Sequence, residues 1–330
     1  MSLEYVAAAA LFGSLVIYAL TGGADFGGGV WDLFASGPRA KPQRALIARA
    51  IAPIWEANHV WLILAVVILF SAFPPAFAAL CTALHVPLGL LLLGIVLRGS
   101  AFAFRSYGPG PDFERRLDRV FAVSSLLTPV MLGVVVGAIA SGGVPASLEP
   151  RPLRAYFDLW LAPFPLALGA FTLCLFAFLA AVYLAVEAED APLREDFRAR
   201  GLASGLACAA LAWLCLWLAS RDAAHVVHGL TTGLRAALFH ASTAAAAIGA
   251  LAALYTRRFR LARVLAAAQV ALVVGGWALA QAPYLVPPDL TITSAAAPRS
   301  VLLPLIAALG AGLALVVPSF LLLFGVFKRR

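Results

Sequence analysis

The chain has 330 residues, of which 63% are hydrophobic and 12% are charged, and its mean hydropathy is +0.95. Soluble globular proteins contain about 45–50% apolar and about 25% charged residues, so this composition excludes an ordinary soluble domain. The net charge of +8 does not indicate a nucleic-acid partner, because lysine and arginine gather in alternate loops between long apolar segments. The composition therefore predicts a polytopic membrane protein.

Nine apolar segments reach or exceed the roughly 20 residues that a bilayer-spanning helix requires. Nine spans place 19 of the 24 lysine and arginine residues on one side, which the positive-inside rule makes the cytoplasmic side. The predicted fold is all-α, a single membrane-embedded domain over residues 1–330, with the N-terminus outside and the C-terminus cytoplasmic. The predicted spans are residues 5–34, 50–72, 78–98, 119–140, 160–186, 201–219, 230–256, 262–282 and 301–327.

The first apolar segment is expected to stay in the protein as its first helix. Neither a basic region before it nor a small-residue cleavage site after it marks a secretory signal. All four cysteines fall inside predicted spans without metal-binding spacing, so we interpret them as apolar fillers and expect no metal site.

The stretch PIWEANHVW, residues 53–61, places a carboxylate, an amide and an imidazole at the start of the second span. A charged side chain inside a span costs at least about 2.5–3.5 kcal/mol, so Glu56 is expected to face a protein interior or a water-filled path. His59 shares its helix face because the two residues are three positions apart, whereas Asn58 points elsewhere. Trp55 and Trp61 flank this group, and an interfacial anchor is the alternative role for both.

A second carboxylate, Asp25, lies in the glycine-rich segment TGGADFGGGV, residues 21–30 of the first span. The glycines lack the phosphate-binding spacing G-x-G-x-x-G and are expected to allow close helix packing. Close packing does not require a carboxylate, so Asp25 is a candidate proton carrier. Asp25 and Glu56 both fall in the inner half of the membrane and are interpreted as groups on one proton path from the cytoplasm.

The third polar stretch is LRGSAFAFR, residues 97–105, at the end of the third span. An arginine near a helix end either extends to the membrane interface or pairs with a carboxylate. If Arg98 pairs with Glu56 or Asp25, it favours the charged form of that acid and opposes the effect of desolvation. The geometry then decides whether the acid can transfer protons.

These three stretches resemble the signatures of subunit II of cytochrome bd-type quinol oxidases, and WEANHVWLI resembles the cyanide-insensitive branch. The glycine-rich segment is similar to the family motif D-G-F-D-L-G, with Gly22 in place of the first aspartate and Asp25, Phe26 and Gly27 at its end. Arg98, Gly99 and Arg105 match a third signature, Arg-Gly followed by Phe-x-Phe-Arg. The resemblance covers the whole chain.

The resemblance implies two four-helix bundles plus one further helix, and a heterodimer with subunit I in a bacterial inner membrane. The complex is then expected to oxidise quinol and to reduce O2 to water during aerobic respiration. Haem b and haem d, or haem b alone, are expected on subunit I together with the main quinol chemistry. The resemblance leaves open whether a bound quinone and a small accessory subunit belong to the complex, which also contacts membrane lipid.

Within this chain, the resemblance implies that Glu56 is a proton relay, with Asp25 second and His59 as a hydrogen-bonded neighbour. Structural support, or support of the partner or of quinone, is expected from Trp55, Asn58, Trp61, Gly27, Arg98, Gly99 and Arg105. Taken without the resemblance, the residues leave two other classes: a proton-coupled secondary transporter and a purely structural membrane subunit. Transporters more often show interrupted helices in both halves, whereas the polar residues here gather in spans 1 to 3.

Overall fold

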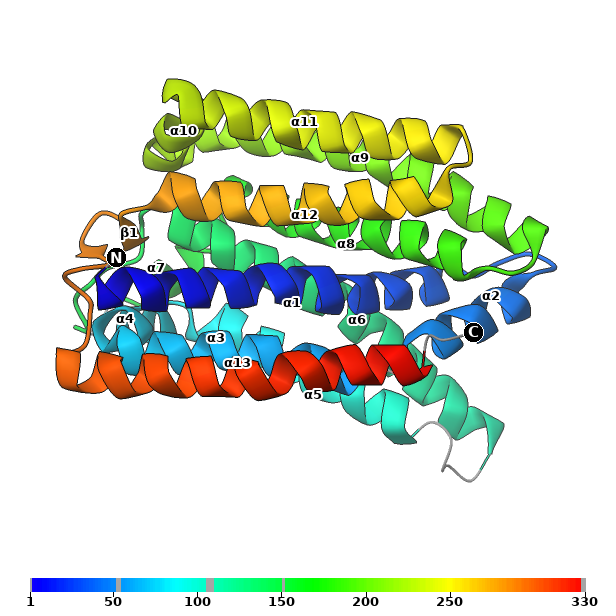
Figure 1. The fold of residues 1–330 in the computed structure, drawn as a ribbon, viewed down its shortest axis with the longest axis horizontal. Helices are drawn as coiled ribbons and strands as arrows, with labels where there is room; N and C mark the ends of the chain where they lie inside the picture. The colour runs from blue at the N-terminus through cyan, green and yellow to red at the C-terminus, as the bar shows by residue number, and fades with distance from the viewer. Residues whose placement is uncertain (1, 52–54, 105–109, 150–151, 328–330) are drawn as a thin grey trace.

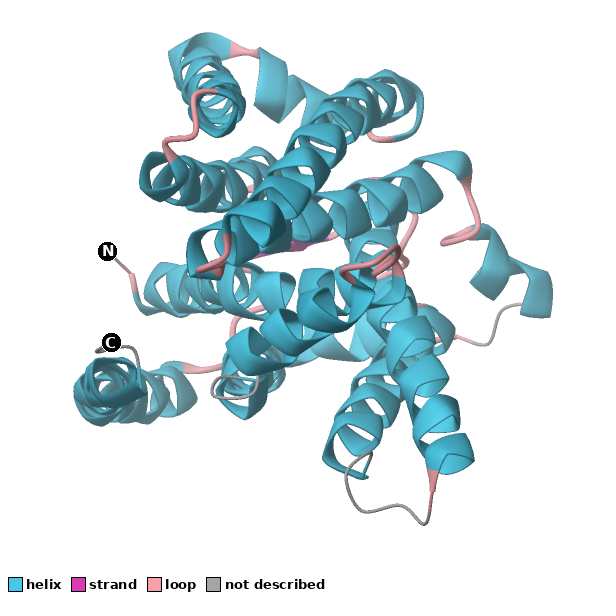
Figure 2. Cartoon of the chain, turned by 90° about the vertical axis from the view of Figure 1, so that its right-hand side faces the viewer, coloured by secondary structure: helices cyan, strands magenta, loops and turns pink. Residues whose placement is uncertain are grey.

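The computed structural model describes residues 2–51, 55–104, 110–149 and 152–327, and only the backbone of residues 55–57, 111, 317, 320, 321 and 323–327. Helices form nearly all of the described chain (Figures 1 and 2). The long helices are α1 (Leu3–Leu33), α3 (Trp55–Ala72), α5 (His85–Phe104), α6 (Pro111–Ala140), α8 (Pro163–Glu187), α9 (Ala191–Asp222), α11 (Gly233–Tyr255), α12 (Phe259–Gln281) and α13 (Arg299–Phe327).

The shorter elements connect these long helices. They are α2 (Ala40–Ile51), α4 (Pro74–Ala83), α7 (Leu153–Asp158), α10 (Ala224–Thr231) and a hairpin of β1 (Tyr284–Val286) and β2 (Leu290–Thr291). In the hairpin, β1 pairs antiparallel to β2 with Tyr284 opposite Thr291. Among the described residues, 8 helices are long and apolar enough to cross a membrane, and the bent pair α3 and α4 makes up to 9. The predicted all-α, multi-pass fold is confirmed.

The third span lies further along the chain than the sequence analysis predicted. Residues 78–98 were expected, whereas α5 runs from His85 to Phe104. The reason is that Pro74 and Pro75 start a separate helix, α4, bent by 116° from α3. Proline fits the first turn of a helix but cannot continue a preceding one, because it lacks the amide hydrogen. Arg98 therefore lies inside α5, more than one turn before its end.

For description, the long helices other than α13 are taken here as two groups of four. α1, α3, α5 and α6 make one group, and α8, α9, α11 and α12 make the other. α1 and α6 also pack against α8, which joins the groups, and α13 lies against α1 and α3 (Figure 1). α1 also packs against α12, and the packing across the groups is as extensive as that within them, so the two bundles and one further helix that the resemblance implied stay a prediction.

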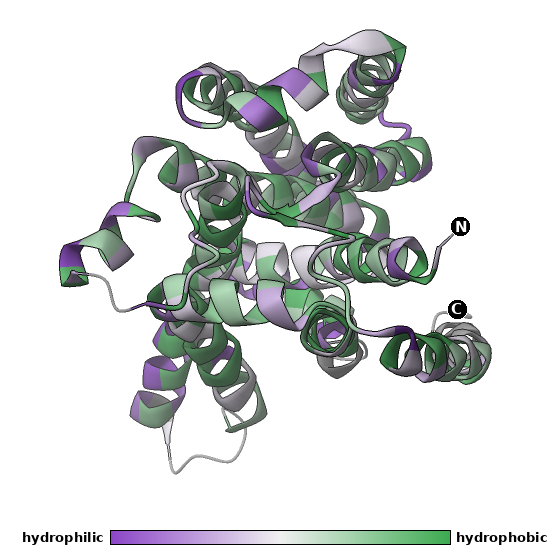
Figure 3. Ribbon diagram, turned by 90° about the vertical axis from the view of Figure 1, so that its left-hand side faces the viewer, coloured by the Kyte–Doolittle hydropathy of each residue, from purple (hydrophilic) through white to green (hydrophobic). Residues whose placement is uncertain are grey.

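The connections gather at two opposite ends of the molecule. Figure 1 shows α2, the α8–α9 and α11–α12 turns and the C-terminus at one end, and the N-terminus, α4, α7, α10 and β1 at the other. Every described connection predicted to be cytoplasmic lies at the first end. Hydrophobic residues predominate along the helices (Figure 3), and apolar side chains such as Ile63, Leu92 and Trp213 are exposed. Such surfaces suit contact with lipid or with another membrane subunit.

The amphipathic helix α2 was not predicted from the sequence, and side-chain contacts tie it to the start of α9. Arg39 donates to Asp196 through Nε at 2.7 Å and Nη2 at 2.6 Å, and Gln43 Nε2 donates to the same carboxylate at 2.8 Å. These hydrogen bonds raise the pKa of Arg39. Arg200 Nη2 donates to Gln43 Oε1 at 2.8 Å and so extends the contact.

Candidate functional site: a buried ion pair between three helices

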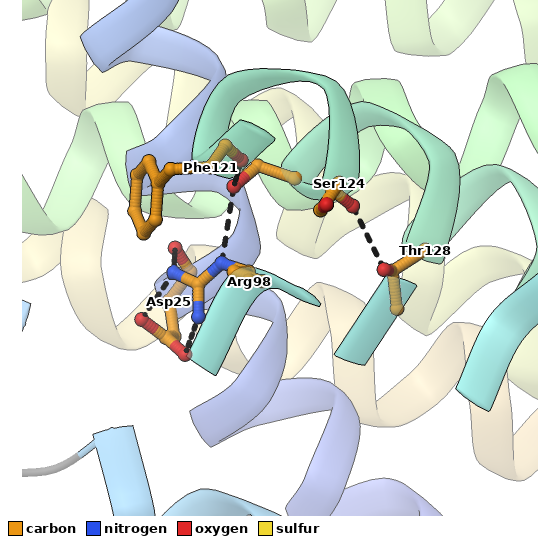
Figure 4. A network of polar contacts seen from close by, with 6 residues as sticks. Asp25, Arg98, Phe121, Ser124 and Thr128 are labelled. Atoms are coloured by element: carbon orange, nitrogen blue, oxygen red, sulfur yellow. Dashed lines mark hydrogen bonds and ion pairs between the residues drawn. The ribbon is translucent and has the colours of Figure 1, made fainter. Parts of the chain in front are cut away.

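Asp25 of α1 and Arg98 of α5 form a bidentate ion pair inside the first group of helices (Figure 4). Arg98 Nη1 donates to Asp25 Oδ2 at 2.8 Å, and Nη2 donates to Oδ1 at 2.8 Å and to the Asp25 carbonyl at 3.1 Å. Arg98 Nε donates to Ser125 Oγ on α6 at 3.0 Å, and that hydroxyl donates to the Phe121 carbonyl at 2.7 Å. Asp25 is 2% exposed and Arg98 is 1% exposed.

Two aromatic rings enclose the guanidinium of Arg98. Its Cζ lies 4.9 Å from the centre of the Phe26 ring and 4.7 Å from the centre of the Phe121 ring. A desolvated cation near aromatic ring faces gains about 2 kcal/mol or more. The charge is therefore matched by one carboxylate, one hydroxyl, one carbonyl and two rings, and the sequence alternative in which Arg98 pairs with a carboxylate is the one realised.

The glycines around Asp25 let α1 approach its neighbours closely. A Cβ added to Gly27 would lie 2.5 Å from the Phe176 carbonyl carbon and 2.7 Å from Ala180 Cβ, both on α8. A Cβ added to Gly29 would collide with the Ser125 side chain, which binds Arg98. The prediction that these glycines serve close helix packing is confirmed, and the packing holds Asp25 within reach of α5 and α6.

The ion pair disfavours proton transfer through Asp25. Both carboxylate oxygens accept charge-assisted hydrogen bonds from one guanidinium, so protonation would break these bonds and leave a buried, uncompensated cation. Arginine itself does not release its proton in proteins. A carrier role for Asp25 would therefore require this pair to open.

His59 of α3 lies close to the ion pair but forms no described bond with it. Its ring centre is 6.0 Å from that of Phe26 and 6.1 Å from that of Tyr18 on α1. Three buried polar atoms in this region have no hydrogen-bond partner among the described residues: His59 Nδ1, Asn58 Nδ2 and Tyr18 Oη. Unsatisfied buried groups are rare in folded proteins and often mark a functional site.

The remaining predicted site residues divide into described and undescribed ones. Trp61 is 8% exposed and packs in the core, so the interfacial-anchor alternative does not apply to it. Gly99 follows Arg98 on α5 and is half-buried. Arg105 and the side chains of Trp55 and Glu56 lie outside the described residues, so the predicted roles of all three stay predictions.

Sequence reasoning missed the α6 side of this site. Ser125 and Phe121 come from the predicted span 119–140, for which the sequence analysis named no site residue. On the same helix, Thr128 Oγ1 donates to the Ser124 carbonyl at 2.8 Å (Figure 4). The hydroxyl residues Ser124, Ser125 and Thr128 in an otherwise apolar span were the available signal. Nothing in their spacing pointed to Arg98, because the contact between α5 and α6 exists only in the folded chain.

A second feature is a cavity of about 970 Å³ between α1, α6, α8, α9, α11 and α12. Its lining is mainly leucine, alanine, valine and phenylalanine side chains. Tyr18, Gln269 and Trp277 also line it, and each has a buried polar atom, Oη, Oε1 and Nε1, without a partner among the described residues. Tyr18 thus belongs both to the cavity wall and to the aromatic group beside the ion pair.

Taken together, these features define an α-helical, multi-pass membrane protein with a fixed ion pair between its first helices. The family described as cytochrome bd terminal oxidase subunit II matches residues 3–327. The chain belongs to this family, as the resemblance indicated. Its membership and its apolar helices place it in the bacterial inner membrane as a multi-pass protein.

Relatives and a solved structure agree with this assignment. The chain is 32% identical over 179 residues to the cytochrome bd-I ubiquinol oxidase subunit 2 of Escherichia coli K12, covering 53% of this chain and 46% of that protein. It is 32% identical over 120 residues to the cytochrome bd ubiquinol oxidase subunit 2 of Bacillus subtilis, covering 36% and 35%. The chain thus spans about half or less of the length of these relatives. A chain of the bd oxidase of Geobacillus thermodenitrificans shares the fold, with a TM-score of 0.79, 23% identity and 99% coverage of both chains.

Proposed function

We propose that this chain is the second subunit of a membrane complex that oxidises quinol and reduces O2 to water. The observation that carries the proposal is the family match over residues 3–327, nearly the whole chain. The E. coli and B. subtilis relatives are both named as subunits of ubiquinol oxidases. The complex then contains a first subunit as partner, and a small accessory subunit is compatible with this arrangement.

The haem groups, b and d or b alone, are assigned to that partner subunit, where they supply electron transfer and O2 reduction. On this chain, His59 does not fit an axial haem ligand. Its imidazole packs among aromatic side chains, with the rings of Phe26 and Tyr18 centred 6.0 and 6.1 Å away, and no haem is assigned to it. The contribution of this chain is instead to hold the heterodimer together and to move protons.

The test of this function uses the protein from its own membrane. This chain is tagged and extracted in mild detergent, co-purifying chains are identified, and the reduced-minus-oxidised visible spectrum and quinol-driven O2 uptake are recorded. The expected result is a second large subunit with haem absorption and oxidase activity. A haem-free chain that purifies alone would contradict the proposal and would favour a secondary transporter, to be tested by substrate-coupled proton flux.

Proton delivery in this complex is assigned to Glu56, at the start of α3, and not to Asp25. Asp25 already compensates a buried cation, whereas a relay must take up and release a proton without leaving an unpaired charge. His59, three residues further along α3, packs beside the rings of Tyr18 and Phe26. We assign it as the hydrogen-bonded neighbour of Glu56 on the proton path.

Glu56→Gln is expected to slow quinol-driven O2 consumption while the complex stays assembled and keeps its haem content. The amide preserves size and hydrogen bonding but cannot release a proton, so only the transfer step is affected. Turnover is measured with an oxygen electrode, and assembly by co-purification. Unchanged turnover in this variant would contradict the relay role and leave a structural role for the chain.

The cavity is the proposed binding site of a quinone on this subunit. Quinone has an isoprenoid tail that suits an apolar lining and two carbonyl groups that accept hydrogen bonds. Tyr18 and Trp277 belong to the cavity wall, and their donors Oη and Nε1 have no described partner. Both atoms are buried, so each side chain has to turn toward the cavity to reach a quinone carbonyl. Gln269 Oε1 would accept a hydrogen bond from the hydroxyl of the reduced form.

The quinone content of the purified complex tests this assignment. Tyr18→Phe removes one donor with little change in volume, and Trp277→Phe removes one donor together with one ring of the indole, so the amount of extractable quinone per complex is expected to fall in both variants. Trp217→Phe is the matched control, because Trp217 is 52% exposed on α9 and does not line the cavity. Equal quinone content in all three variants, measured by chromatography of solvent extracts, would count against the cavity as the site.

A further inference from the structure

The hydroxyl of Tyr18, near the middle of α1, is a buried polar group that neither the ion pair nor the helix backbone binds. The polar side chains from residue 14 to residue 25 of α1 are those of Ser14, Tyr18, Thr21 and Asp25. Ser14 and Thr21 donate to carbonyl groups of their own helix at 2.8 and 2.9 Å, and Asp25 accepts from Arg98. Tyr18 is 1% exposed, and its Oη has no partner among the described residues. Of these four side chains, Tyr18 is the one that has a buried donor without an acceptor.

The imidazole of His59 on α3 lies beside the Tyr18 phenol. The two ring centres are 6.1 Å apart, and His59 Nδ1 is also buried without a partner among the described residues. The ring of Phe26 is centred 6.5 Å from that of Tyr18 and 6.0 Å from that of His59, so the two polar groups meet in apolar surroundings. Buried polar groups without a protein partner are commonly joined by an ordered water that bonds two or more of them. A phenol and an imidazole side by side are the partners that such a water requires.

Gly22 leaves the space in which the Tyr18 ring lies. A Cβ added to Gly22 would be 2.8 Å from Cε2 and 3.3 Å from Cζ of that ring. Residues four positions apart share one face of a helix, so a side chain at position 22 would displace the phenol. Tyr18 also lines the cavity of about 970 Å³, which gives a displaced ring a place to go. The absence of a side chain at position 22 therefore keeps the phenol beside His59.

We propose that Tyr18 positions His59 for proton transfer through one ordered water. The Tyr18 hydroxyl donates to this water, and the water donates to His59 Nδ1, so the proton of the neutral imidazole is carried by Nε2. The hydrogen bond at one ring nitrogen decides which tautomer a histidine adopts. Nε2 is then the donor that His59 offers to the Glu56 carboxylate, three residues earlier on the same face of α3. The inference rests on the proposed path through Glu56 and His59.

Tyr18→Phe tests the inference in the complex purified from its own membrane. The substitution removes only the hydroxyl, and quinol-driven O2 uptake per haem is expected to fall about three- to tenfold, the ratio that corresponds to one hydrogen bond. The ratio of the rates in H2O and D2O is expected to rise, because proton transfer becomes slower relative to the other steps. Tyr183→Phe, the same change at a half-buried tyrosine on α8 outside the cavity lining, is the control and is expected to keep both values. An unchanged isotope ratio in Tyr18→Phe would overturn the inference.

Gly22→Ala is an independent variant that keeps the hydroxyl and displaces the ring. Its isotope ratio is expected to rise as in Tyr18→Phe. Gly13→Ala on the same helix is the control and is expected to match the unmodified complex, because its added Cβ has no neighbour within 4 Å. A normal isotope ratio in Gly22→Ala would show that the place of the phenol does not matter and would contradict the positioning role.

Two further variants separate this inference from the proposals beside it. Trp277→Phe removes the other donor of the cavity wall, from a ring that packs against Phe12, and is expected to keep the isotope ratio even when quinone is lost. An equal rise in Trp277→Phe would assign the effect to quinone and overturn the role of Tyr18. Unchanged turnover in Glu56→Gln would contradict the proton path itself. Slower turnover in Glu56→Gln together with a normal isotope ratio in Tyr18→Phe would leave the path in place and reject Tyr18 alone.

Discussion

At the scale of single residues, the Asp25–Arg98 pair illustrates why a buried salt bridge is costly to break. Both side chains are withdrawn from water, and their mutual attraction, with Ser125 and the Phe26 and Phe121 rings, offsets the lost hydration. If one partner is removed, the other keeps its desolvation cost without compensation. The pair is therefore a constraint on how α1, α5 and α6 assemble.

Asp25→Asn is expected to destabilise the protein by about 3–5 kcal/mol, because it leaves the Arg98 guanidinium buried without a counter-charge. The matched control is Asp112→Asn: Asp112 is 86% exposed in its side chain and pairs with Arg115 at 3.4 Å, so a change below about 1 kcal/mol is expected. Unfolding in detergent is the measurement. The double variant Asp25→Leu, Arg98→Met should recover much of the loss, and an Asp25→Asn protein as stable as the unmodified one would show that the pair is not the constraint.

At the scale of helices, close approach of α1 to α8 depends on residues without a side chain. The Phe176 backbone occupies the space where a Cβ of Gly27 would lie, so α8 passes directly over α1 at this point. One turn earlier on α1, a Cβ of Gly23 would meet the Phe176 ring. Helix association in a membrane relies on such packing, because an apolar helix gains no hydrophobic free energy when it exchanges contact with lipid for contact with another helix. The ion pair and the glycine contacts act on the same helix and fix its depth and rotation.

Gly27→Ala is expected to lower stability by about 1–3 kcal/mol, because the added methyl group forces α1 and α8 apart. Gly13→Ala on the same helix is the control: no atom lies within 4 Å of its added Cβ, so the substitution is expected to be neutral or to stabilise by up to about 1 kcal/mol through helix propensity. The two variants are compared by thermal unfolding of the purified complex. Equal effects would show that helix propensity, and not contact with α8, governs both positions.

At the scale of the whole molecule, the basic connections share one end and the proline-rich connections share the other. This separation is the three-dimensional counterpart of the positive-inside pattern in the sequence. It also places the α2–α9 contact at the end that the charges assign to the cytoplasm. Orientation is thus a property of the summed loops and not of any single residue.

Cysteine labelling tests this orientation. Ser36→Cys and Asp289→Cys introduce exposed thiols at opposite ends of the molecule. A membrane-impermeant maleimide applied to intact spheroplasts is expected to label the cysteine at 289 and to reach that at 36 only after the membrane is opened. The protein without either substitution gives the background of the four native cysteines, two of which are buried. The reverse labelling pattern would invert the predicted topology.

The sequence by itself determined the all-α, multi-pass membrane fold and the family, because hydrophobic length, loop charge and short motifs are local properties of the chain. It predicted nine spans, where the described residues give 8, or up to 9 with the bent pair α3 and α4. It also identified Asp25, Arg98 and the packing role of the glycines around Gly27. It misplaced the third span, since two prolines can end one helix and start another within a continuous apolar run. Only the tertiary structure decided that Arg98 pairs with Asp25, that Ser125 and Phe121 complete the site, and that Tyr18 joins it to the cavity. In the sequence, Arg98 is 27 positions from Ser125 and 73 positions from Asp25, and no local pattern specifies which helices meet.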